Sequence, residues 1–169
     1  MSPFALTIYY DPNILLNEVR EVATALARKA PSLIIKELKE LSLSSSPYFL
    51  STYDTERNQY NGQKLLNYLI NHQASFPFLW IISYDLYVPS LNFVFGLGTK
   101  DSGAIVSFFR LPSIEMKFKE SLHETGHVIG LAHCRNYCVM QFSNSLREAL
   151  KKPSEFCDAC KAKIARLIH

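Results

Sequence analysis

The sequence has no cysteine before residue 134 and no long hydrophobic run. Its uninterrupted apolar stretches, such as Phe78–Ile82, are too short to cross a bilayer, so we expect no contact with a membrane. The first residues lack a basic start followed by a long apolar core, so we expect no secretory signal and a cytoplasmic location. With 48% apolar and 20% charged residues and no repeat, the composition excludes disorder, collagen and coiled coil.

The net charge of +3 arises in one segment, residues 146–169, because the 12 basic and 12 acidic residues outside it cancel. Such a segment can contact phosphate, or it can form a helix face exposed to water. We favour the exposed face, so a nucleic-acid partner is not expected. The segment holds three acidic residues and six basic ones, namely Arg147, Lys151, Lys152, Lys161, Lys163 and Arg166.

The order of apolar segments predicts one α/β domain over residues 1–169. Asp11-Pro12 is typical of a helix start and Pro31 of a helix end, between two β-branched segments. A strand, a helix and a strand at this spacing favour a parallel pair with a crossover helix. We expect strands at Phe4–Tyr10, Leu33–Leu38, Phe78–Ile82, Leu91–Leu97 and Ala104–Phe109, and helices at Asn61–His72, from Ser113 to about Ile129, from Ser145, and from about Cys157.

Three histidines have the spacing of ligands to one metal ion. His123 and His127 would lie on the same face of a helix, because residues four apart do so. Gly130 can end that helix in a left-handed turn, which lets the chain reverse and bring His133 to the same ion. Three imidazoles leave one zinc position open to water, which is typical of a catalytic site. The alternative is a helix with hydrogen-bonded core histidines.

Glu124 follows the first of these histidines and has the chemistry of a general base. A carboxylate at this position can take a proton from a zinc-bound water and pass it to a leaving amine. The sequence therefore predicts peptide hydrolysis with Glu124 as the catalytic residue. A site that binds zinc without turnover is the main alternative.

Four cysteines form a second candidate metal site. Cys157 and Cys160 have the usual knuckle spacing, and Cys134 and Cys138 are one residue further apart. A closed set of four thiolates predicts a structural zinc, with two disulfides or free thiols as alternatives. Together with the histidine site, this predicts two zinc ions, one catalytic and one structural.

The segment His123–His133 and the cysteines after it resemble the archaemetzincin family of metzincin zinc metalloproteases. The resemblance implies a zincin-like α/β fold with a mixed, mostly parallel sheet. It also implies an upper subdomain of about residues 1–130, a smaller zinc-stabilised C-terminal subdomain of about 131–169, and an active cleft between them. Met140 would be the Met-turn residue beneath the catalytic zinc, although core filling is its alternative.

The resemblance further implies an antiparallel edge strand that pairs with an extended peptide substrate. Our candidate for this strand consists of Asn92, Phe93, Val94, Phe95 and Gly96, and a plain internal strand is the alternative. We expect a zinc-dependent peptidase that acts on peptides, with a monomer favoured. A catalytically silent zinc module that captures extended peptides is the alternative function.

Overall fold

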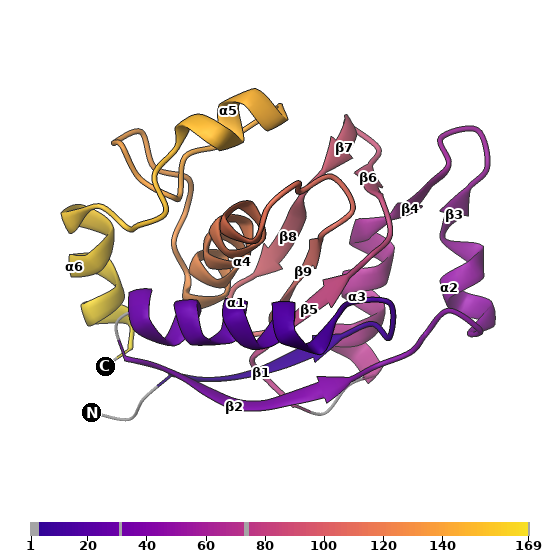
Figure 1. The fold of residues 1–169 in the computed structure, drawn as a ribbon, viewed down its shortest axis with the longest axis horizontal. Coiled ribbons are helices and arrows are strands. Elements are labelled where there is room, and N and C mark those ends of the chain that lie inside the picture. Colours follow the sequence, from indigo (N-terminus) through magenta and orange to yellow (C-terminus); the bar gives the residue numbers. More distant parts are fainter. Residues whose placement is uncertain (1–3, 31, 73–74, 169) are drawn as a thin grey trace.

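The computed structural model describes residues 4–30, 32–72 and 75–168, in which strands and helices are mixed up to residue 72, five strands follow in a row, and three helices end the chain (Figure 1). The strands are β1 (Phe4–Tyr10), β2 (Leu33–Glu40), β3 (Tyr53–Asp54), β4 (Gln59–Asn61), β5 (Phe78–Ile82), β6 (Leu86–Val88), β7 (Leu91–Val94), β8 (Gly96–Thr99) and β9 (Gly103–Ser107). The helices are α1 (Leu16–Lys29), α2 (Pro47–Ser51), α3 (Gly62–His72), α4 (Ile114–Ile129), α5 (Leu146–Lys151) and α6 (Asp158–Leu167).

Five strands form the main sheet, in the order β2-β1-β5-β9-β8. The strand β1 pairs in parallel with β2 and β5, and β5 pairs in parallel with β9. The edge strand β8 is antiparallel to β9. The predicted mixed, mostly parallel sheet is thus confirmed, including the parallel pair on either side of α1.

Helices cover both faces of this sheet, and the central strand β5 is buried along its whole length. Its side chains alternate between two hydrophobic clusters, as the pleat of a strand requires. Leu79 and Ile81 pack with residues of α1 and α4. Phe78, Trp80 and Ile82 pack with residues of α3 on the opposite face. This packing holds α4 across β8 and β9 (Figure 1).

A second sheet, in the order β3-β4-β6-β7, was not predicted. The expected single strand Leu91–Leu97 is wrong, because the chain leaves one sheet and enters the other at Phe95. The Phe95 side chain is buried in the core, and its carbonyl accepts a hydrogen bond from the N–H of Ser107 at 2.7 Å. The strand β7 therefore belongs to the second sheet, and β8 to the first.

The predicted start of α1 at Asp11-Pro12 is also wrong, because the helix begins at Leu16. The Asp11 carboxylate instead accepts hydrogen bonds from the N–H of Asn13 at 2.7 Å and the N–H of Ser83 at 2.6 Å. These bonds hold a turn ahead of the helix. The predicted stop at Pro31 lies outside the described residues, and the helix ends at Lys29.

The helices of the second half begin where the sequence predicts. The Ser113 side chain accepts a hydrogen bond from the N–H of Met116 and caps α4. The Ser145 side chain accepts one from the N–H of Glu148 and caps α5. In the part of the chain that the structure describes, no helix is both long enough and apolar enough to span a bilayer.

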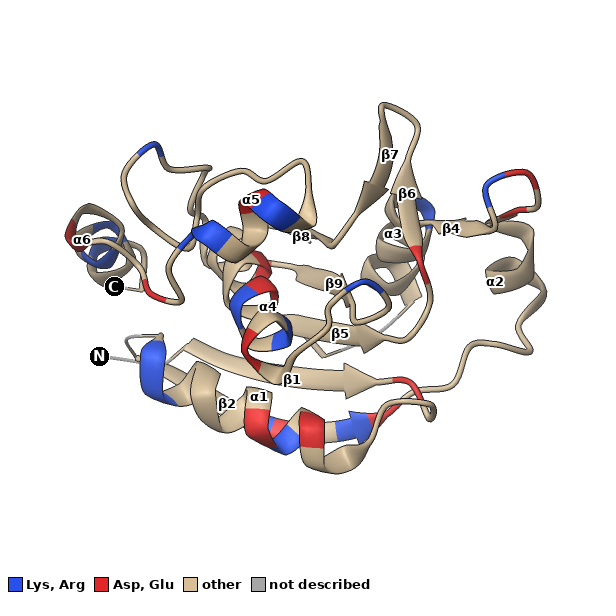
Figure 2. Ribbon diagram, turned by 45° about the horizontal axis from the view of Figure 1, so that its top comes forward, with Lys and Arg blue, Asp and Glu red and all other residues tan. Residues whose placement is uncertain are grey.

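The charged C-terminal segment is exposed for the most part, and α5 and α6 each carry both basic and acidic residues (Figure 2). Lys152 does not lie on the exposed helix face that we expected for the basic residues of this segment. It follows the last residue of α5 and is only 3% exposed.

Candidate metallopeptidase site

Three histidines meet at the C-terminal end of α4 and the loop after it. His123 and His127 lie one helical turn apart on α4, and the helix ends at Gly130. The φ angle of Gly130 is 113°, a left-handed conformation in which a Cβ atom would be strained. The chain then reverses, so that His133 returns to the two helical histidines. The possible ligand atoms of the three rings lie within 4.8 Å of one another.

Hydrogen bonds to the backbone fix how the two helical rings are turned. His123 Nδ1 lies 2.8 Å from the carbonyl oxygen of Val139, and His127 Nδ1 lies 2.8 Å from that of Leu131. Since a carbonyl oxygen only accepts, each Nδ1 donates a proton and each Nε2 keeps a lone pair. The two Nε2 atoms are 3.1 Å apart. Two lone pairs that face each other at this distance fit a shared cation, as zinc requires.

The surroundings also favour the neutral form of the imidazoles. Burial lowers the pKa of His123 well below its ordinary value, and Lys152 nearby lowers it further. Burial likewise lowers the pKa of His127 and of His133. A neutral imidazole is the form that binds a metal ion, so the three rings are suited to hold one.

Glu124 lies on α4 between the helical histidines and the edge strand β8. Burial raises the pKa of its carboxyl group well above the ordinary value, and Glu120 contributes to the rise while Lys152 opposes it. Glu124 Oε2 is buried and has no hydrogen-bond partner among the described residues. A buried carboxylate oxygen without a partner is costly, and it is suited to accept a proton from a group that enters the site.

Met140 lies against α4 at Gly126, which is between the two helical histidines in sequence. A Cβ atom at Gly126 would lie 2.4 Å from the sulfur of Met140, so the close approach depends on glycine. Met140 is fully buried, and its carbonyl accepts a hydrogen bond from the N–H of Cys134 at 2.9 Å. Met140 thus packs directly against the helix that carries two of the histidines, and its role beneath a zinc ion stays a prediction.

A cavity of about 540 Å³ opens over the histidines and Glu124. One wall comes from β7 and β8, and the opposite wall from Phe142, Ser143 and Asn144. The five residues that we expected to bind a peptide all line the cavity, but they do not form one strand. Asn92, Phe93 and Val94 belong to β7, Phe95 lies between the strands, and Gly96 begins β8.

The antiparallel edge strand next to the histidines is therefore Gly96–Thr99, not Asn92–Gly96. Its two glycines, Gly96 and Gly98, let this strand approach α4 closely. A Cβ at Gly96 would lie 2.6 Å from Cγ of Glu124, and one at Gly98 would lie 2.7 Å from Cβ of His127. Glycine is thus required at both positions for the strand to lie this close to the site.

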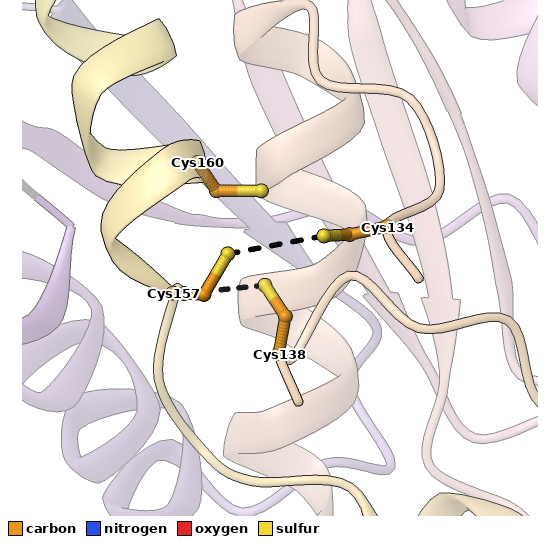
Figure 3. A group of neighbouring side chains, drawn as sticks. All are labelled: Cys134, Cys138, Cys157 and Cys160. Atoms are coloured by element: carbon orange, nitrogen blue, oxygen red, sulfur yellow. Dashed lines mark hydrogen bonds between the residues drawn. The ribbon is translucent and has the colours of Figure 1, made fainter. Parts of the chain in front are cut away.

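The four cysteines come together from the loop after α4 and the start of α6 (Figure 3). Cys134 Sγ lies 3.8 Å from Cys157 Sγ, and Cys138 Sγ accepts hydrogen bonds from the N–H groups of Met140 and Cys157. All four are free rather than disulfide-bonded, and their sulfur atoms lie within 4.8 Å of one another. Four thiols at these distances fit a tetrahedral metal site.

The thiol groups differ in acidity. Burial raises the pKa of Cys138 and of Cys160. Burial also acts to raise the pKa of Cys157, but hydrogen bonds from the Cys160 N–H and from Asn136 outweigh it and bring that pKa to about 6.

A buried ion pair next to the histidines was missed by sequence reasoning. Lys152 Nζ lies 2.9 Å from Glu120 Oε1, and the two side chains are only 2% and 3% exposed. Both line the cavity, and Lys152 Nζ lies 3.5 Å from His123 Nδ1. A lysine at the end of a short polar helix looks like any exposed lysine, so no local signal would have found it.

Comparison with known proteins gives one consistent result. Residues 50–166 match the model of peptidase family M54. An archaemetzincin from Nanoarchaeum equitans is 46% identical over 115 residues, which is 68% of this chain and 68% of that protein. An archaemetzincin from Archaeoglobus fulgidus is 35% identical over 166 residues, 94% of this chain and 99% of the relative.

Solved structures agree with the sequence comparison. The crystal structure of an archaemetzincin from Methanopyrus kandleri has a TM-score of 0.83 at 32% identity, covering 98% of this chain and 96% of that one. That of the Archaeoglobus fulgidus archaemetzincin complexed with malonate has a TM-score of 0.76 at 32% identity, covering 94% of this chain and 99% of that one. The expected zincin-like α/β fold is thereby confirmed. With its family, its fold and its group of histidines in agreement, the chain belongs to the archaemetzincins of peptidase family M54 and is a zinc metallopeptidase.

Proposed function

We propose that the chain hydrolyses peptide bonds with a zinc ion held by His123, His127 and His133, and with Glu124 as the general base. When bound, the zinc ion supplies a Lewis acid that polarises the scissile carbonyl and lowers the pKa of a water molecule to about 7. The two helical histidines would hold it through their Nε2 atoms, since their Nδ1 atoms donate to backbone carbonyls, and His133 would complete the set. Met140 supports this site from beneath α4.

The proposed catalytic role of Glu124 rests on the position of its Oε2 atom. It is a buried oxygen without a hydrogen-bond partner among the described residues, and it belongs to the same cavity as the three histidines. In our proposal it accepts the proton of the attacking water and then delivers it to the amine nitrogen as the C–N bond breaks. Burial raises the pKa of this carboxyl group, which makes its carboxylate a stronger base and so favours the first of these two steps.

The edge strand β8 is suited to hold the substrate in an extended form. It pairs with β9 on one side only, and Gly96, Leu97 and Gly98 line the cavity. We propose that the peptide main chain pairs with this edge, while β7 and the loop at Phe142–Asn144 contact its side chains. The cleft would thus lie between residues of about 1–130 and those of about 131–169.

The second zinc ion in our proposal is structural and is held by Cys134, Cys138, Cys157 and Cys160. Four thiolates fill a tetrahedral coordination shell, which leaves no position for a substrate. Their geometry supports this role because the cluster joins the loop after α4 to the start of α6 (Figure 3). It would hold the C-terminal part in place.

The substitution Glu124→Ala tests this function against its alternative, a zinc module that binds peptides without cleaving them. We expect the variant to keep two zinc ions per chain by elemental analysis and to lose cleavage of a peptide library by at least about 100-fold, the usual contribution of a general base. If the unaltered, zinc-loaded protein binds peptides but cleaves none, the alternative function is correct.

A further inference from the structure

The ion pair of Glu120 and Lys152 forms a charged end of the substrate cavity, which the catalytic mechanism does not use. Glu120 lies one turn before Glu124 on α4, and Lys152 reaches it from the end of α5, which lies above α4 (Figure 1). Both side chains line the cavity together with His123. The pair lies on the Nδ1 side of His123, away from the Nε2 atom that faces His127.

The two side chains have hydrogen-bonding capacity left over. Lys152 Nζ contacts both oxygens of Glu120, since it donates a hydrogen bond to Oε2 at 3.2 Å and lies 2.9 Å from Oε1. A carboxylate offers about four acceptor positions and an ammonium group three donors. Lys152 cannot donate to the nearby His123 Nδ1, because that atom donates its own proton to Val139. One donor and at least one acceptor therefore remain at the cavity end.

Ser143 adds a third polar group to the lining of the cavity. Its hydroxyl oxygen is buried and has no hydrogen-bond partner among the described residues. Ser143 belongs to the wall opposite β7 and β8. The lining of the cavity thus includes a pair of opposite charges, which cancel, and a buried hydroxyl group.

A ligand group for this end must both donate and accept hydrogen bonds and carry no charge. A carboxylate would bind Lys152 but would lie beside Glu120 and Glu124, and an ammonium group would lie beside Lys152. An apolar side chain would exclude water and leave the donor and the acceptor unsatisfied. A carboxamide matches both, since its NH₂ group can donate to Glu120 while its oxygen accepts from Lys152.

We propose that Glu120 and Lys152 determine specificity by binding a carboxamide side chain, glutamine above all, next to the scissile bond of the substrate. Glutamine is favoured over asparagine because the pair lies behind the ring of His123, where a longer side chain is needed. This inference rests on the proposed peptidase function. It adds the class of substrate, a peptide with glutamine beside the bond that is cut.

The test compares three peptide hydroxamates that differ only in one side chain, glutamine, glutamate or methionine, which have similar lengths. Affinity for the zinc-loaded protein is measured by calorimetry, so no turnover is needed. We expect the glutamine compound to bind about tenfold more tightly than the other two, as expected when a buried polar pair is satisfied rather than left unpaired. Equal affinities, or tighter binding of methionine or glutamate, would overturn the proposal without using any variant.

A double substitution assigns the preference to the ion pair. We expect Glu120→Leu with Lys152→Met to abolish the preference for glutamine and to make the methionine compound the tightest, because removing both charges leaves neither unpaired. The matched control is Lys119→Met. Lys119 is also buried, but its Nζ donates to the carbonyls of Ala149 and Leu150, and it does not line the cavity. The control should keep the glutamine preference.

The outcomes separate this proposal from the peptidase function. If the hydroxamates bind with the expected ranking but no peptide is cleaved, the binding of glutamine by Glu120 and Lys152 is supported and the peptidase function fails. If peptides are cleaved while the double variant keeps the ranking of the unaltered protein, the peptidase function stands and the role of Glu120 and Lys152 is refuted.

Discussion

His133 and Cys134 are joined by one peptide bond, yet their side chains belong to two different candidate metal sites. The N–H of Cys134 donates to the carbonyl of Met140, which is the residue that packs against α4 at Gly126. The position of the third histidine is therefore fixed by the same backbone that places the first cysteine. A metal ion held by the cysteines would orient a ligand of the other site.

The substitution Cys157→Ser tests this coupling. Loss of one thiolate should release the cysteine-bound zinc and loosen the backbone at Cys134. We expect the affinity of the histidine site for zinc to fall by about 10- to 100-fold, the range for loss of a group that orients a ligand. Elemental analysis and competition with a chromogenic chelator would measure both sites. One full equivalent of tightly bound zinc at the histidine site would contradict the prediction.

Asn136→Ala is the matched control. The Asn136 amide donates to Cys157 Sγ at 3.7 Å, so this substitution removes a contact of the same sulfur but keeps all four thiols. We expect two zinc ions per chain in this variant.

Gly96→Ala should displace the general base. The new methyl group would lie 2.6 Å from Cγ of Glu124 and 2.6 Å from the carbonyl oxygen of Ile105, so either the helix or the strand must shift. Overpacking of this kind costs about 1–3 kcal/mol of stability. Because the shift falls on Glu124, we expect kcat/KM to fall by at least about tenfold, and stopped assays with a fluorogenic peptide would measure it.

Gly62→Ala provides the comparison. A methyl group there would meet Leu97 Cδ1 at 3.1 Å, the far end of a flexible side chain on β8, and would contact neither Glu124 nor a histidine. Catalysis should be close to that of the unaltered chain. An equal loss of activity in both variants would mean that Gly96 acts through general stability.

Pairing of the substrate with β8 can be tested through the peptide itself. In an antiparallel pair, alternate residues exchange hydrogen bonds with the neighbouring strand. Methylation of a peptide N–H that donates to β8 should reduce kcat/KM by about five- to tenfold, the loss of one hydrogen bond. Methylation at the next residue along should have little effect. A series without alternation would exclude pairing with Gly96–Thr99.

The sequence predicts the parts of this molecule that depend on local chemistry. The cap at Ser113, the left-handed turn at Gly130 and the histidines four residues apart on one helix all follow from neighbours in the chain. The cysteines could be grouped for the same reason, because each pair has the spacing of a metal ligand set.

Long-range pairing was beyond such reasoning. The segment Leu91–Leu97 has the composition of one strand, and nothing in it shows that β7 pairs with β6 while β8 pairs with β9. The register is decided by partners distant in sequence and by the burial of Phe95. The edge strand next to the histidines therefore begins at Gly96, four residues after the expected start at Asn92.

The burial of charged side chains could not be predicted from the sequence either. The residues next to Lys152 in the sequence do not distinguish it from an exposed lysine, and its partner Glu120 lies 32 residues earlier. Only the packing of the C-terminal segment on α4 brings them together. The same reasoning explains why Asp11 was interpreted as a helix cap, although its carboxylate binds Ser83 across 72 residues.

Glu124→Gln in chelator-treated protein tests the burial of the general base. A carboxyl group whose pKa is raised on folding binds its proton more tightly in the folded state. The folded protein therefore loses stability as the pH rises from the ordinary carboxyl pKa towards the raised one. Glutamine carries no charge and has no such pH dependence, so we expect the variant to gain stability relative to the unaltered chain as the pH rises from about 4 to 7. Urea unfolding at a series of pH values would show this difference vanish below about pH 4, where the carboxyl group is protonated in both states. A difference that stays constant from about pH 4 to 7 would mean that Glu124 is not stabilised in its protonated form.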